Sequence, residues 1–195
     1  THAQLFENFE SGEKASYTGA SISLSTGDWF LEDALLGNLS NDKYNGSQGV
    51  RMDRRDGKTG NIYMLFDKTG GADELSFYIA NYGSSSGNSL QVQYSTDGGS
   101  NWLNLGEEIA GTGTLTQYTI KVEISGNVRF KFIHASGDDR LNIDDIRITD
   151  FVEAQDEATL DVTVDDLTAS SGQALIFPKT LVGTSQSMNL VLKNI

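Results

Sequence analysis

The stretch QYTIKVEISGNVRFKFIH, residues 117–134, decides the fold class. Every second residue of its first half is apolar, and the alternation resumes after Ser-Gly-Asn, where Val128, Phe130 and Phe132 share one side. A period of two places apolar side chains on one face of a strand and polar ones on the other. The stretch therefore predicts two half-buried strands separated by a turn.

The same alternation continues outward from this stretch, and Gly-rich and Ser-rich breaks separate the segments that carry it. Helical periodicity is nearly absent, and at most one helical turn is expected at residues 34–36. The sequence therefore predicts an all-β protein, an antiparallel β-sandwich over residues 1–151. The further strands expected are residues 4–10, 22–24, 29–31, 50–53, 73–81 and 89–95.

The composition of the chain excludes several classes of function. The 195 residues include 14 Lys and Arg against 27 Asp and Glu, a formal charge of −13, which argues against binding to nucleic acid or anionic membranes and favours divalent cations. The chain has no Cys, so disulfides, thiol catalysis and Cys-based zinc sites are excluded. No apolar run reaches the ~18 residues of a membrane helix.

A domain boundary is predicted at residues 152–157, where an acidic, polar segment interrupts the alternation. Residues 158–195 are too few for an independent sandwich, since chains below ~40 residues rarely fold unaided. They resemble the first strands of the immunoglobulin-like repeats of bacterial surface proteins, which makes them a partial second β-domain. The alternative is that they add strands to the first domain.

The octapeptide STDGGSNW, residues 95–102, fits the pattern S-x-D-x-G-x-x-W and resembles the Asp-box hairpin of sialidases. Asp97 is expected to accept hydrogen bonds from turn amides, while Gly99 permits positive φ. Trp102 is expected to pack back over the hairpin. We interpret Ser95, Asp97, Gly99 and Trp102 as a structural turn, with Trp102 as a ligand platform the alternative.

A change of phase marks LNIDDIRI, residues 141–148. Leu141 and Ile143 share one parity and Ile146 and Ile148 the other, so burying all four needs an extra residue, and a bulge at the Asp144-Asp145 pair supplies it. Two adjacent carboxylates on an ordered strand repel unless a cation or a basic side chain neutralises them. Carboxylate oxygens are ligands that calcium prefers.

Short motifs in a particular order resemble the calcium-containing jelly-roll modules of bacterial secreted or surface proteins, which include galactose-binding-like carbohydrate-binding modules and adhesive MAM domains. The resemblance covers residues 1–150 and implies jelly-roll topology. The motifs that carry it are Phe9-Glu10, Trp29, Asn45-Gly46, Arg51 and Asp144-Asp145-Ile146.

The resemblance also implies one structural Ca²⁺ between the first and last strands of the sandwich. Its implied ligands are Glu10, Asp144 or Asp145, and a carbonyl near Asn45 or Gly46. The alternative is an ion pair between Glu10 and Arg51 with no metal.

No catalytic motif is found, and the two histidines are His2 and His134. His134 shares the parity of Phe130 and Phe132, which favours a core or strand-end residue over a general base. We therefore expect no enzymatic activity. The protein is expected to be extracellular or on the cell surface, with a signal peptide removed.

The function predicted is a non-catalytic carbohydrate-binding module. The alternatives are a structural or adhesive spacer in a multidomain surface protein, and an accessory domain of a secreted nuclease, protease or glycoside hydrolase. An outward sheet face would supply amides, charges and aromatic rings to a sugar. The candidate glycan-binding residues on it are Tyr63, Tyr78, Gln91, Gln93, Arg129 and Lys131.

Overall fold

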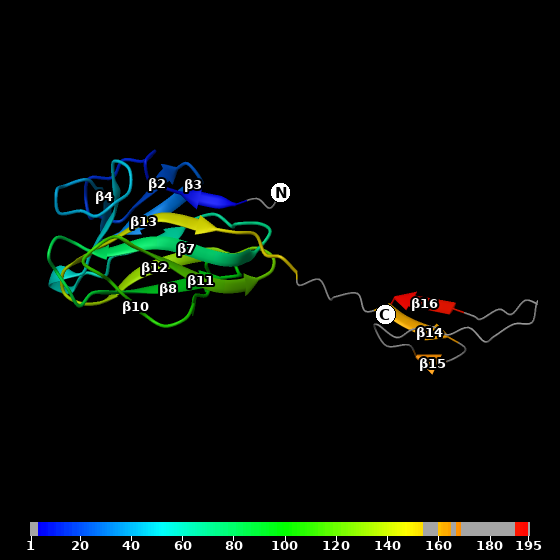
Figure 1. Ribbon diagram of the computed structural model, residues 1–195. Coiled ribbons are helices and arrows are strands. Elements are labelled where there is room, and N and C mark those ends of the chain that lie inside the picture. Colours follow the sequence, from blue (N-terminus) through cyan, green and yellow to red (C-terminus); the bar gives the residue numbers. More distant parts are fainter. Residues whose placement is uncertain (1–3, 154–159, 165–166, 169–189, 195) are drawn as a thin grey trace, which may run out of the picture. The chain divides into compact units, whose positions relative to one another are not determined.

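The computed structural model describes residues 4–153, 160–164, 167–168 and 190–194 (Figure 1). The chain forms two compact units, Thr1–Val152 and Glu153–Ile195. No helix in the described part of the chain is long and apolar enough to cross a membrane.

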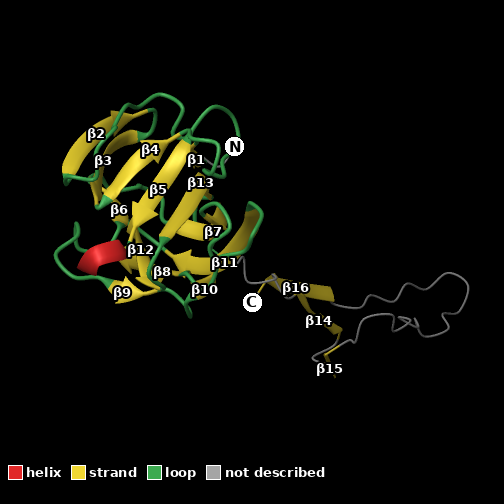
Figure 2. Ribbon diagram, turned by 90° about the vertical axis from the view of Figure 1, so that its left-hand side faces the viewer, coloured by secondary structure: helices red, strands yellow, loops and turns green. Residues whose placement is uncertain are grey.

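The first unit contains two antiparallel sheets, as the alternation predicts (Figure 2). In the first sheet the order is β11 (Thr116–Ile124), β7 (Ala72–Asn81), β13 (Arg140–Ile148), β5 (Gly49–Asp53) and β4 (Ala34–Gly37), and β1 (Leu5–Glu7) also pairs with β13. In the second the order is β10 (Ile109–Ala110), β8 (Ser89–Ser95), β12 (Arg129–Ser136), β6 (Asn61–Met64), β3 (Gly27–Glu32) and β2 (Ala20–Leu24), with β9 (Leu103–Asn104) beside β8. The all-β sandwich prediction is confirmed.

Strand β13 is the centre of the first sheet, because it pairs with β7, β5 and β1. Figure 2 shows β4, β5, β13 and β7 side by side. The pair between Leu5 and Ile148 joins the two ends of the unit's sequence.

The core lies between the sheets and consists of the apolar side chains of alternate residues. Phe77 of the first sheet and Phe132 of the second, both fully buried, meet edge to face with ring centroids 5.4 Å apart. Trp29 is also fully buried, and its ring contacts that of Phe9 at 6.0 Å. His134 is fully buried as well, so its expected place in the core is confirmed.

The bulge predicted in β13 is present. Asp144 pairs with Tyr78, but the next pair joins Arg147 to Ser76, so three steps along β13 match two along β7. Asp145 takes φ 49°, an uncommon left-handed backbone that accommodates the extra residue. Both pairs of apolar residues on β13 are consequently buried.

Two local predictions are wrong. Residues 34–36 belong to strand β4 rather than to a helical turn, and all four residues of β4 are buried, which removes the alternation that would have indicated a strand. Strand β1 ends at Glu7 instead of residue 10, because Phe9 takes φ 58° and its N–H donates to Glu7 Oε1 at 2.8 Å. Glu10 therefore lies in a turn. A single 3₁₀ turn, η1 (Arg55–Gly57), follows β5.

In the second unit three strands form a separate antiparallel sheet in the order β15 (Leu167–Thr168), β14 (Leu160–Val164) and β16 (Leu190–Asn194). Most of the predicted immunoglobulin-like segment, residues 158–195, lies outside the described residues. Its assignment stays a prediction.

Candidate functional site

The outer face of the second sheet carries one row of side chains that crosses five strands. Phe30 on β3 pairs with Tyr63 on β6, and Tyr63 pairs with Lys131 on β12. Lys131 in turn pairs with Gln93 on β8, and Gln93 with Asn104 on β9. On β3, β6 and β12 the neighbours of these residues along each strand are buried in the core, which sets the outward direction of the row.

Three aromatic rings lie together on this face. The rings of Phe30 and Tyr63 are stacked, with centroids 5.3 Å apart and planes at 26°. Trp102 meets Tyr63 edge to face at 6.0 Å. All three side chains are only partly buried. We call Phe30, Tyr63 and Trp102, with Lys131 and Gln93, the aromatic strip.

The turn at residues 95–101 places Trp102 on the strip. Asp97 Oδ1 accepts hydrogen bonds from Ser95 Oγ at 2.7 Å and from the Asn101 N–H at 2.9 Å, and the Gly99 N–H donates to Ser95 Oγ. The side-chain and backbone hydrogen bonds from Asn101 lower the pKa of Asp97 to about 2. A Cβ on Gly99 would lie 3.4 Å from the Trp102 ring, so the indole does pack back on the turn. The same ring contacts Tyr63, which makes the turn part of the site's construction.

Polar groups complete the strip. The Lys131 ammonium lies 5.4 Å from the Tyr63 ring centroid and 5.5 Å from that of Trp102, and burial lowers its pKa. Gln93 Nε2 donates to Asn104 Oδ1 at 2.9 Å at an exposed position. Ring faces next to an ammonium and amides can stack on the apolar face of a sugar ring and hydrogen-bond to its hydroxyl groups.

The structure divides the six residues predicted to bind glycan. Tyr63, Gln93 and Lys131 lie on the strip. Gln91 is buried, and its amide donates to the carbonyl groups of Val92 and Gly106. Arg129 forms an ion pair with Asp67 at the margin of the same face. The sixth residue, Tyr78, lies on β7 of the other sheet.

Sequence reasoning missed Phe30 as a surface residue. The signal was available, because Trp29 and Leu31 are the buried neighbours and a strand places the residue between them outside. The contact of Trp102 with Tyr63 had no such signal, because it joins a turn to a strand that lies far away in the sequence.

The residues implied to bind calcium gather around the loop that precedes β5. The Asn45 N–H donates to Asp144 Oδ2 at 2.8 Å, and Asn45 Nδ2 donates to Asp145 Oδ2 at 2.7 Å. Glu10 Oε1 accepts from the Ser47 N–H at 3.0 Å. Glu10 lies so close to Gly46 that a Cβ there would be 2.4 Å from its Oε1.

For the carboxylates at this loop, no ion pair with a basic side chain is found in the described part of the chain. Asp144 is fully buried, and burial raises its pKa to about 7, with the charges of Asp145 and Glu10 acting in the same direction. Burial opposes the ionisation of Glu10 as well, but hydrogen bonds from Ser47 and Gln48 outweigh it and lower the pKa. Arg51 pairs with Asp42 at 3.4 Å, and no ion pair with Glu10 is found among the described residues. The alternative of a Glu10–Arg51 pair is therefore wrong.

The carboxylates of Glu10, Asp144 and Asp145 are not arranged as a preformed metal site. Within the described ranges, no three acidic or histidine side chains are grouped so as to hold a metal ion. The carboxylates accept hydrogen bonds from the loop instead. The oxygen donors are nevertheless of the type that suits calcium.

No protein-family model matches the sequence, and comparison with curated protein sequences gives no match. Solved structures with the same fold do match. The K2 cleaved adhesin domain of Lys-gingipain (Kgp) is 20% identical with a TM-score of 0.53, covering 75% of this chain and 98% of that domain. The K3 cleaved adhesin domain of Lys-gingipain from Porphyromonas gingivalis is 20% identical with a TM-score of 0.52, covering 76% and 99%.

Carbohydrate-binding modules are also similar. The CBM22-1 xylan-binding domain of Xyn10C from Paenibacillus barcinonensis is 12% identical with a TM-score of 0.52, covering 76% of this chain and 95% of that domain. A point mutant of the module CBM29-2, complexed with mannohexaose, is 11% identical with a TM-score of 0.51, covering 76% and 92%. Residues 4–152 thus have the jelly-roll fold of carbohydrate-binding modules and adhesin domains, which confirms the fold that the short motifs implied.

Proposed function

We propose that this protein is a non-catalytic glycan-binding module of a secreted or surface-exposed bacterial protein. The aromatic strip carries the proposal. Its three rings are assembled on a sheet by backbone register and by one hydrogen-bonded turn, so little ordering is needed on binding. The similar xylan-binding and mannohexaose-bound domains support a glycan as the ligand class.

The test is calorimetric titration of the protein with mannohexaose and with xylohexaose, followed by the Tyr63→Ala variant. Loss of a central aromatic contact should weaken binding by about 2 kcal/mol, roughly 30-fold. Tyr78→Ala is the matched control, because Tyr78 is a partly buried tyrosine on the outer face of the other sheet. Equal effects of the two substitutions would contradict the proposal, as would an absence of binding across a panel of neutral glycans.

A spacer or adhesive role is the second candidate, favoured by the two-unit organisation of the chain and by the similarity to adhesin domains. A spacer needs no glycan and tolerates Tyr63→Ala. Binding to host or matrix proteins with no glycan bound would support this role.

We further propose that Ca²⁺ binds at the loop before β5, where Asp144, Asp145 and Glu10 form no ion pair with any basic side chain that the structure describes. The ion would supply the positive charge that the buried Asp144 carboxylate lacks. At calcium 100-fold above its dissociation constant, the folded state would gain about 2.7 kcal/mol.

Removal of calcium with a chelator should lower the melting temperature of the wild-type protein, and Asp145→Asn should abolish this difference. Asp138→Asn removes one charge from an exposed residue and serves as the control. If calorimetry on the chelator-treated protein records no calcium uptake, the metal is absent from the folded protein and the loop's amides alone hold the carboxylates.

A further inference from the structure

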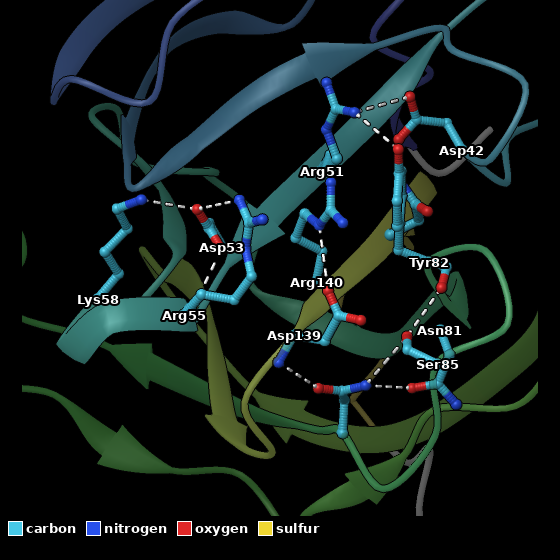
Figure 3. Close-up of polar contacts among 12 residues, drawn as sticks. Asp42, Arg51, Asp53, Arg55, Lys58, Asn81, Tyr82, Ser85, Asp139 and Arg140 are labelled. Atoms are coloured by element: carbon cyan, nitrogen blue, oxygen red, sulfur yellow. Dashed lines mark hydrogen bonds and ion pairs between the residues drawn. The ribbon is translucent and has the colours of Figure 1, made fainter.

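The outer face of the first sheet carries a basic and aromatic cluster that the proposed function does not use (Figure 3). Arg51 on β5 and Arg140 on β13 are its central cations, and Tyr82 follows β7. The Arg140 guanidinium lies 3.9 Å from the centroid of the Tyr82 ring and that of Arg51 lies 5.3 Å from it. We call Arg51, Arg140, Tyr82 and Tyr17 the arginine–tyrosine cluster.

The Arg51 guanidinium is incompletely paired. Its side chain is 9% exposed, and Nη1 lies 3.4 Å from Asp42 Oδ2 and 3.5 Å from the Tyr82 hydroxyl. Its Nε is buried and has no hydrogen-bond partner among the described residues. An unpaired buried donor on a charged group carries a high desolvation cost, so the positive charge of Arg51 is only partly compensated by the two long contacts of Nη1.

Asp53, which lies on the same strand as Arg51, is paired with two other basic side chains. Its Oδ1 and Oδ2 accept from Arg55 at 2.8 and 3.0 Å, and Lys58 also donates to Oδ2 at 2.8 Å. Figure 3 shows Arg55 and Lys58 turned toward Asp53, while Arg51 and Arg140 lie together beside Tyr82. The guanidinium groups of Arg51 and Arg140 therefore pair with carboxylates other than Asp53.

Those carboxylates meet each guanidinium through a single nitrogen. Asp42 divides its oxygens among Arg51 Nη1, the Leu39 N–H and Asn142 Nδ2. Asp139 Oδ1 accepts from Arg140 Nε at 3.1 Å. Neither pair is bidentate, so two guanidinium groups next to one ring keep donors for a further anion.

An aromatic side chain lies at the edge of this cluster. Tyr17 is partly exposed. The centroid of its ring lies 5.9 Å from the Arg51 guanidinium and 5.3 Å from the Lys58 ammonium. Burial raises the pKa of the Tyr17 hydroxyl, although the charge of Arg51 opposes this. The hydroxyl therefore stays protonated at neutral pH and is available as a donor.

We propose that the arginine–tyrosine cluster binds the carboxylate of an acidic sugar, a second ligand site on the sheet opposite the aromatic strip. The two Nη groups of Arg140 form no hydrogen bond with the described residues, and such a pair matches a planar carboxylate in a bidentate geometry. Arg140, with a side chain 22% exposed, and the ring of Tyr17 lie where the sugar would enter. The choice of a sugar over an acidic peptide rests on the proposed glycan-binding function.

The probe is a trimer of galacturonic acid, titrated into the full chain alongside its methyl ester. The ester keeps the shape of the sugar and removes its charge, so binding should fall at least about tenfold, the loss of a charge-assisted hydrogen bond. In a ¹⁵N correlation spectrum, the Nε–H signal of Arg140 should shift with the acid and stay in place with the ester. Equal binding of acid and ester, or no binding of either, overturns the proposal.

Arg140→Gln should weaken binding of the acid at least about tenfold. Arg147→Gln is the matched control, because it removes an arginine from the same strand that contacts Phe6 outside the cluster. Arg51→Gln serves less well, since it leaves Asp42 buried without its cation. Equal effects of the Arg140 and Arg147 substitutions overturn the proposal.

Tyr63→Ala separates the two proposed sites. If this variant retains acid binding and the wild-type protein binds no neutral glycan, the result supports the cluster as the acid site. The same result refutes the glycan-binding function of the strip. Loss of acid binding in Tyr63→Ala together with its retention in Arg140→Gln assigns the acid to the strip and overturns the cluster. Tighter binding of hexaglutamate than of the trimer would identify a peptide site instead, which also overturns the proposal.

Discussion

A double-mutant cycle on Tyr63 and Trp102 tests whether the aromatic strip is assembled before any ligand arrives. The perturbations are Tyr63→Ala, Trp102→Ala and the two together. The edge-to-face contact of the rings at 6.0 Å is worth about 0.5–1.5 kcal/mol beyond the area that it buries. The Lys131 ammonium over the indole, at a partly buried position, adds about 0.5–1 kcal/mol. Trp102→Ala alone should therefore destabilise the protein by about 1–2.5 kcal/mol.

Because the two rings share this contact, the double variant should lose less than the sum of the single losses. The expected difference is about 0.5–1.5 kcal/mol, measured as free energies of unfolding in urea. The control cycle pairs Trp102 with Tyr78, on the other sheet, and its coupling should be zero within about 0.5 kcal/mol. A Tyr63–Trp102 coupling no larger than that of the control would refute a preassembled strip and leave Trp102 a purely local residue of its turn.

Three further predictions concern single residues. Asp97→Ala should lower the melting temperature and, by releasing Trp102, weaken glycan binding; a lower melting temperature with unchanged affinity would confine Asp97 to the turn. Burial lowers the pKa of His134 from 6.5 to about 4, so the unfolded chain takes up this proton first. The contribution of His134 to stability should therefore fall by up to about 3 kcal/mol as the pH drops from 6.5 to 4. Urea denaturation should show this fall as the difference between the wild-type protein and His134→Phe, because protonation of Asp144, with a pKa of about 7, acts in the opposite direction in both proteins. Asp53→Asn should cost about 1.5–3 kcal/mol in urea unfolding, because it removes charge-assisted hydrogen bonds to a buried carboxylate while water solvates the partly exposed Arg55 and Lys58 that remain. Asp73→Asn, from a more exposed pair, should cost at most about 1 kcal/mol, and similar losses would contradict the assignment.

The sequence predicted the features of the fold that depend on period-two patterning. The alternation predicted the sandwich, and the change of parity between Ile143 and Ile146 predicted the bulge in β13, because burial on one side of a sheet tolerates no phase error. Strand β4 was not predicted, because burial on all sides leaves no alternation to detect.

The candidate sites were only partly predictable. Tyr63, Gln93 and Lys131 follow from strand parity, whereas the contact of Trp102 with Tyr63 depends on how a turn is seated against the sheet. The alternative that paired Arg51 with Glu10 was wrong for the same reason. Asp42 lies in a loop with no periodic pattern, and only the tertiary structure brings it to the guanidinium.

The central position of β13 has a consequence for synthesis of the chain on the ribosome. Strands β5, β7 and β1 all precede β13 in the sequence, yet each pairs with it. The 87 residues from Asp53 to Arg140 (140 − 53) take roughly 4–17 s to synthesise at ~5–20 residues per second. During that interval the nascent chain presents the apolar faces of an incomplete sheet, and exposed faces of this kind are what chaperones protect. We expect a chain whose synthesis stops in this interval to aggregate.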